Sequence, residues 1–259
     1  MNPVVVSAAL AGGLFVALLL AQYLGRALGK HRQERYGDAD EAGAGAVAGA
    51  VFALLGLLLA FTFTGADSRF EHRRDLVVQQ VNALGTAWMR IDLLPAADQP
   101  PIRDLFRRYV DGLRQATTHA DDPRTVGSIG TGLQSLQNQL WRRCVDSANR
   151  DGRPQVATLL LPPLNDSFDL TTTRLAAVRI HVHPGVILLL IALAVLAGLL
   201  AGHAQAITKR PDWLHMVVFA ALISATLYFI LDFEYPRLGL ITLDSVDTFM
   251  NELRASLNN

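Results

Sequence analysis

The sequence predicts an all-α membrane protein with four transmembrane helices and a helical extramembrane domain inserted between helices two and three. Charged residues make up 18% of the 259-residue chain, which is well below the roughly 25% of an average soluble domain. The charges avoid four long stretches, and no segment of useful length alternates apolar and polar residues as a half-buried β-strand does. Composition and pattern therefore both favour helices in a lipid bilayer.

Four stretches without Asp, Glu, Lys or Arg are long enough to cross a membrane. A helix of roughly 20 apolar residues spans the hydrocarbon core, and a soluble helix would keep a polar face that these stretches lack. The first stretch has no basic segment before its apolar run, so we expect a retained helix and not a signal peptide. The predicted transmembrane helices are residues 1–25, 42–66, 184–208 and 213–231.

Two short loops between the predicted transmembrane helices are basic. The loop of residues 26–41 holds Arg26, Lys30, Arg32 and Arg35, and the loop after the third helix holds Lys209 and Arg210. The positive-inside rule places these loops in the cytoplasm and the extramembrane domain on the other side. Arginines close to the membrane in the extramembrane domain favour the opposite orientation, so both stay open.

The second transmembrane helix carries small residues on one side. Such residues let helix backbones approach each other closely in membranes. Two interpretations stay open: the stripe packs against other helices of the same chain, or it packs between subunits around a common axis. The residues are Gly45, Gly49, Ala53, Gly56 and Ala60.

The same helix ends in two aromatic residues that alternate with two hydroxyl residues: Phe61, Thr62, Phe63 and Thr64. This segment could form a narrow, partly polar pore, with the aromatic rings as the constriction and the threonine oxygens facing the ion. Alternatively, each Phe anchors the helix at the membrane surface and each Thr bonds its own backbone. We therefore treat these four residues as pore-lining candidates.

Charged residues gather where the fourth transmembrane helix leaves the membrane. Asp232, Glu234 and Arg237 lie within six residues. In one interpretation these charged residues simply lie where the helix ends and have no further role, since Pro236 and Gly239 terminate the helix. In the other they form a charged vestibule, or an ion-pair clamp to the extramembrane domain.

The extramembrane domain, residues 67–183, is predicted to contain about four helices. Apolar residues from Phe70 to Ile91 follow helical spacing, and only Gly65 separates this run from the second transmembrane helix, so we expect one long rod. The remaining expectations are a helix after Asp98, a loop over residues 117–132, a helix through Cys144, a turn at 151–154, a helix from 155 that Pro162 and Pro163 kink or interrupt, and a C-terminal tail of residues 232–259.

Several classes of function are disfavoured by what the sequence lacks. The 23 basic and 23 acidic residues balance, which argues against nucleic acid as a partner. A single cysteine, Cys144, excludes an intrachain disulfide and a cysteine-rich zinc site. No catalytic motif is present. We therefore expect no enzymatic activity, no cofactor and no metal.

Several local segments resemble the bestrophin-like bacterial membrane proteins, a family long listed as a domain of unknown function. The matching segments are residues 60–63, 69–70, 82–87, 92–95, 161–166, 171–174 and 231–239. The group is distantly similar in layout to bestrophin chloride channels. The resemblance implies a pentameric anion channel of the bacterial inner membrane, with a pore neck in helix two and both termini in the cytosol.

Two functional hypotheses follow. The leading one is an oligomeric ion channel whose pore is lined by transmembrane helix 2, with further copies of the chain, membrane lipid and inorganic ions as its partners. The alternative is a non-conducting membrane scaffold or envelope sensor that acts through its helical domain.

Overall fold

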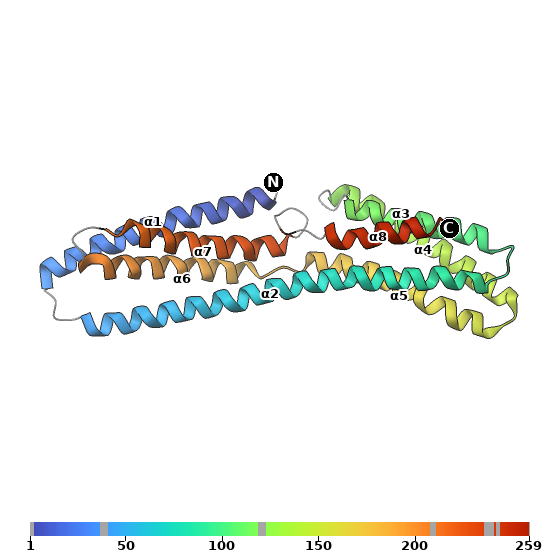
Figure 1. The fold of residues 1–259 in the computed structure, drawn as a ribbon, viewed down its shortest axis with the longest axis horizontal. Coiled ribbons are helices and arrows are strands. Elements are labelled where there is room, and N and C mark those ends of the chain that lie inside the picture. The colour runs from blue at the N-terminus through green and yellow to red at the C-terminus, as the bar shows by residue number, and fades with distance from the viewer. Residues whose placement is uncertain are drawn as a thin grey trace. The chain divides into compact units, whose positions relative to one another are not determined.

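A computed structural model describes residues 3–36, 41–118, 123–207, 211–235, 241 and 244–258. Every regular element within these ranges is a helix (Figure 1), so the predicted all-α class is confirmed. Four of the helical segments are long and apolar enough to cross a membrane. The elements are α1 (Pro3–Tyr36), α2 (Glu41–Arg90), η1 (Ile91–Leu93), α3 (Gln99–Thr118), α4 (Pro123–Asp151), α5 (Pro154–Arg179), α6 (Pro184–Ala204), η2 (Gln205–Ile207), α7 (Trp213–Glu234) and α8 (Asp244–Ser256).

The chain divides into two compact units. The apolar unit comprises Met1–Phe70 and His181–Ile241, and the amphipathic unit comprises Glu71–Ile180 and Thr242–Asn259. Helix α2 contributes residues to both units and has no interruption at Gly65. The predicted continuous rod is therefore confirmed.

In the apolar unit, α1 packs along α6 and α7 (Figure 1). Its core consists of aliphatic side chains from all four long helices, among them Leu18, Leu59, Ala194 and Leu227. The closest approach is between α1 and α6, where glycines meet backbone. A Cβ atom built on Gly25 would lie 2.0 Å from the Leu199 carbonyl oxygen. Only glycine allows this separation of the two helices.

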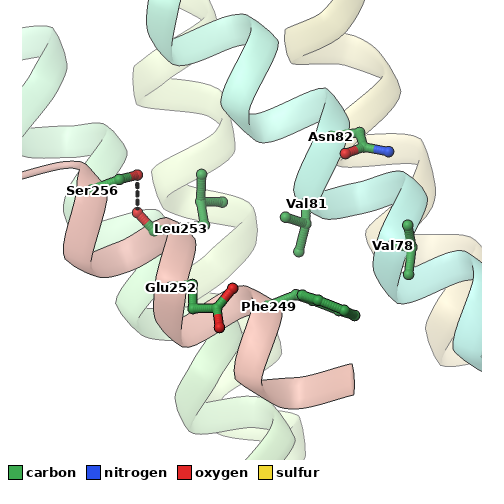
Figure 2. Close-up of a pocket in the computed structure, with 7 residues that line it drawn as sticks. All are labelled: Val78, Val81, Asn82, Phe249, Glu252, Leu253 and Ser256. Carbon is green, nitrogen blue, oxygen red and sulfur yellow. Dashed lines mark hydrogen bonds between the residues drawn. The ribbon is translucent and has the colours of Figure 1, made fainter. Parts of the chain in front are cut away.

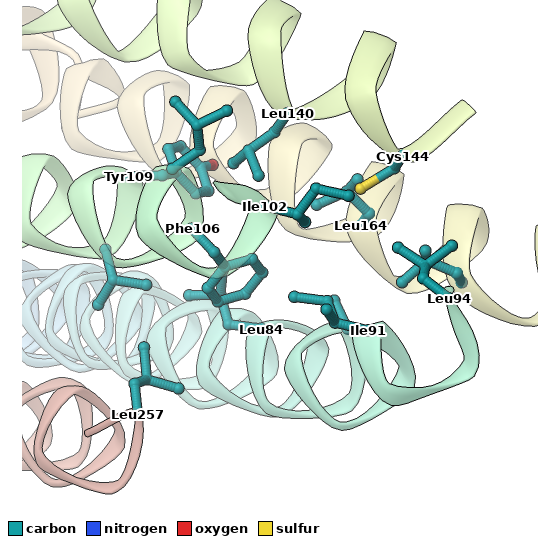
Figure 3. Close-up of a cluster of buried hydrophobic side chains, with 14 of the residues drawn as sticks. Leu84, Ile91, Leu94, Ile102, Phe106, Tyr109, Leu140, Cys144, Leu164 and Leu257 are labelled. Carbon is teal, nitrogen blue, oxygen red and sulfur yellow. The ribbon is translucent and has the colours of Figure 1, made fainter. Parts of the chain in front are cut away.

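In the amphipathic unit, α3, α4 and α5 pack with the second half of α2 around a continuous core (Figure 3). Phe106 and Tyr109 of α3 lie at its centre, with Leu84 of α2 and Leu140 of α4. The predicted turn between α4 and α5 is confirmed, and Gly152 there has a φ of 72°, a conformation that favours glycine.

Two predicted loops are largely helical. Helix α1 continues to Tyr36, because the charged residues of this stretch are good helix formers and the Arg26 Nε atom donates to the Gln205 carbonyl oxygen. The predicted loop over residues 117–132 is also wrong in most of its length, since α4 begins at Pro123, and proline is favourable in the first turn of a helix.

Pro162 and Pro163 do not interrupt α5, which is continuous from Pro154 to Arg179. A proline inside a helix leaves the carbonyl four residues earlier without its usual donor. For Pro163 that carbonyl belongs to Leu159, and the Arg90 guanidinium donates to it at 2.5 Å. An arginine from α2 thus replaces the missing amide.

Part of the predicted C-terminal tail of residues 232–259 is helical. Residues 244–256 form α8, which belongs to the amphipathic unit. Met250 and Leu257 are buried in its core. The Arg254 guanidinium donates to both carboxylate oxygens of Asp111, at 2.7 and 3.0 Å.

Candidate functional site: the outer face of α2 and the last turn of α7

The small-residue stripe of α2 is not covered by the described part of the chain. No atom lies within 4 Å of a Cβ built on Gly45, Gly49 or Gly56, and Ala53 and Ala60 are exposed. The opposite side of the helix packs into the apolar core through Leu55 and Leu59, among others. Packing within the chain, the first of the two interpretations, therefore does not explain the stripe.

The four pore-lining candidates divide between two sides of α2. Phe61 is 67% exposed and Thr64 is exposed, three residues further on the same face. Thr62 is buried, and its hydroxyl donates to the Leu58 carbonyl at 2.7 Å. Phe63 packs edge-on against Phe233 of α7, with 5.5 Å between the ring centroids. Phe63 is also 37% exposed and lies three residues after Ala60 and seven after Gly56, so it continues the uncovered stripe, with Phe61 and Thr64 exposed beside it.

Glu234, at the end of α7, accepts donors from two other segments. Its Oε1 atom accepts the Arg69 Nε and Nη2 atoms at 2.9 and 2.5 Å. Its Oε2 atom accepts the Val182 amide at 3.2 Å and lies 3.4 Å from His181 Nδ1. The His181 ring also lies over the Tyr235 ring, with centroids 4.9 Å apart. Glu234 thus joins the end of α7 to α2 and to the segment that precedes α6.

Asp232 and Glu234 do not form an exposed vestibule. They are 3% and 2% exposed, and the Asp232 Oδ2 atom accepts the Ile241 amide at 2.9 Å. Glu234 forms an ion pair with Arg69, which lies within the predicted segment 67–183 but belongs to the apolar unit. Arg237, the third residue of this candidate group, lies outside the described residues.

A buried polar network links four helices of the amphipathic unit. The Gln80 carboxamide of α2 donates to the Thr171 hydroxyl at 2.7 Å and accepts the Arg174 guanidinium of α5. The Thr171 hydroxyl also bonds the Tyr109 hydroxyl of α3 at 2.8 Å, and Gln137 of α4 donates to Tyr109 at 3.1 Å. Burial raises the pKa of Tyr109, which keeps this phenol neutral.

An open groove of about 420 Å³ lies between α2 and α8 (Figure 2). Val81 and Phe249 face it from the two helices, and Glu252 lies at its edge. Across the described ranges, no three His, Cys, Asp or Glu side chains gather closely enough to hold a metal ion.

Sequence reasoning missed the residues that hold α1 against α6. Gly25 and Gly29 are four residues apart, as are Gly198 and Gly202, and each meets the partner helix. The four-residue spacing of small residues is the same as on α2, so the sequences of α1 and α6 also indicated close helix packing. Sequence reasoning also missed Gln22, whose buried carboxamide donates to the Met216 carbonyl of α7 at 3.0 Å.

The comparison with known families agrees with this architecture. No curated protein and no solved structure matches the chain. A family model described as a bestrophin-like domain matches residues 12–246, which include most of α1 and all of α2, α6 and α7. Together with the four membrane-capable helices, this match supports a multi-pass membrane protein. The chain belongs to the bestrophin-like family.

Proposed function

We propose that the protein is an oligomeric ion channel in which the outer face of α2 lines the pore. The observation that supports this function most directly is the small-residue stripe, which no described atom of the chain covers. A helix that faces lipid has no need of small residues, whereas helices that meet around an axis do. The family match makes a channel the favoured class.

Phe61 and Thr64 are the residues that we propose to line the narrowest part of the pore. They lie beside the end of the stripe, one and four residues after Ala60, and their side chains are exposed. In a ring of subunits, Phe61 would form an apolar constriction and Thr64 a ring of hydroxyl groups. Phe63, which is 37% exposed and in line with the stripe, would add to this constriction, and its contact with Phe233 fixes this stretch of α2 against α7.

The finer features of the channel come from the family layout. We propose a pentamer that conducts anions across the bacterial inner membrane, with residues 67–183 as an extramembrane insert between α2 and α6. Conduction of this kind needs neither an enzymatic reaction nor a cofactor, and inorganic ions would be its substrate.

Ion flux through reconstituted liposomes tests the proposed function. Phe61→Ala and Thr64→Val should each change anion flux several-fold. Phe229→Ala and Thr226→Val are the matched controls, because both residues lie on α7, where Phe229 is exposed and Thr226 is half-buried, and they should leave flux unchanged. Equal effects of the α2 and α7 substitutions would contradict pore lining by α2.

Particle imaging in mild detergent tests the assembly separately. The wild-type protein should form a closed ring with α2 at the axis. Gly49→Leu should reduce the fraction of rings, because the leucine side chain would keep neighbouring α2 helices apart. A monomer or dimer without flux would overturn the channel. A ring without flux would favour the non-conducting scaffold.

A further inference from the structure

The chain passes between its two units three times, after Phe70, before His181 and after Ile241. Within the apolar unit, the last turn of α7 contacts the chain at each of these three points. The Phe233 ring lies 5.4 Å from the Phe70 ring, Glu234 accepts the Val182 amide, and Asp232 accepts the Ile241 amide. One turn of helix therefore holds all three segments where they leave the apolar unit.

Glu234 joins two of these segments, because each of its two carboxylate oxygens accepts a hydrogen bond from a different one. Oε1 faces Arg69 of α2, while Oε2 faces the amide of Val182 and the ring of His181. Its side chain is 1% exposed. A buried carboxylate is stable only when charged and hydrogen-bonding partners replace the lost water, so this geometry depends on all of these donors together.

We infer that Glu234 is a positioning residue, which fixes α2 at Arg69 and the start of the α6 segment at Val182 relative to the end of α7. Asp232 does the same for Ile241. Arg69 lies five residues after Thr64, so the position of the proposed pore segment depends on this contact. That consequence for conduction rests on the proposed function, whereas the anchoring itself does not.

Glutamine at position 234 provides the sharpest test. A glutamate has two acceptor oxygens, whereas a glutamine has one acceptor and one donor group. Glu234→Gln therefore cannot satisfy Arg69 and Val182 at once, although its size is unchanged. Asp232→Asn is the reciprocal variant, because it alters the acceptor of Ile241 and leaves Glu234 intact.

Hydrogen exchange of the full-length protein in detergent separates the two anchors. Glu234→Gln should speed exchange of the Val182 amide by roughly tenfold or more, as expected for loss of a hydrogen bond to a charged group, and leave Ile241 unchanged. Asp232→Asn should do the reverse. Glu71→Gln, which removes an exposed ion pair with Arg74 on α2, should change neither amide.

Equal acceleration at both amides in Glu234→Gln, or none at either, would overturn the inference. If Glu234→Gln does not fold, Arg69→Gln tests the same carboxylate from the other side, and Arg69→Lys should restore the wild-type exchange in part. Flux is measured in parallel. Selective exchange effects in a protein that conducts no ions would sink the channel and leave the anchoring standing.

Discussion

Gly202 of α6 lies directly against the carbonyl oxygen of Gln22 of α1. A Cβ atom at residue 202 would fall 1.9 Å from that oxygen, which is far inside contact distance. Gly25 stands in the reciprocal position against Leu199. The two helices therefore pack backbone against backbone, and Gln22 in turn donates its side-chain amide to α7. This crossing sets the arrangement of three of the four membrane-capable helices.

Gly202→Ala should destabilise the apolar unit. The obstructing atoms belong to the backbone of α1, so the helices must separate, and overpacking of this kind costs about 1–3 kcal/mol. Thermal unfolding in detergent measures the loss. Gly12→Ala is the control: no atom lies near its Cβ position, and alanine has the higher helix propensity. An unchanged midpoint for Gly202→Ala would contradict the close crossing.

The glycines also mark the limit of sequence reasoning. The spacing of small residues predicted close packing for α2 alone, and it could not say whether that stripe faces other helices of the same chain or another subunit. The answer depends on which segment, distant in the sequence, packs against that face of the helix. The partners of Glu234 were unpredictable for the same reason, because Arg69 and Val182 come from distant parts of the sequence.

The local errors have a different origin. Basic residues after Gly25 were assigned to a loop, although most of them are good helix formers and α1 includes them. Helix α8 was missed although Met250, Leu253 and Leu257 follow helical spacing. The helical spacing of these apolar residues was visible in the sequence, but the segment is short and was not recognised as a helix. The four uncharged stretches were predicted well because apolar segments of this length cross a bilayer as helices, which satisfy all of their own backbone groups in lipid.

Leu257→Ala should destabilise the amphipathic unit by about 2–5 kcal/mol, the usual cost of a buried Leu→Ala substitution. Leu257 is fully buried in that core. Phe249→Ala, on the same C-terminal segment but 45% exposed at the groove, should cost less. Chemical unfolding followed by circular dichroism compares them, and an equal cost would mean that α8 is not docked through Leu257.

Cys144 should be almost inert towards thiol reagents in the folded protein. Burial raises the pKa of its thiol to about 12, from an ordinary value near 8.5, and the reactive species is the thiolate. At pH 8 we expect maleimide labelling at least about a thousandfold slower than for an exposed cysteine. Labelling in denaturant should be fast. Rapid labelling without denaturant would show that the core opens around α4.

Asp98 should contribute a pH-dependent part of the stability. Hydrogen bonds from Ser147 and Arg150, at 2.7 and 3.0 Å, lower the pKa of this carboxyl. Because its folded pKa lies below the unfolded one, the stabilisation is complete above the unfolded pKa, near 4. It is lost as the pH falls through the folded value.

Ser147→Ala removes the largest cause of that shift. It should lower the unfolding midpoint at pH 7, and the difference from wild type should narrow as the pH is reduced from 5 to 3. Ser135→Ala is the control on the same helix, since Ser135 is exposed and its hydroxyl accepts from Gln139, remote from Asp98. A difference that stays constant over this range would show that Ser147 stabilises the helix independently of the charge on Asp98.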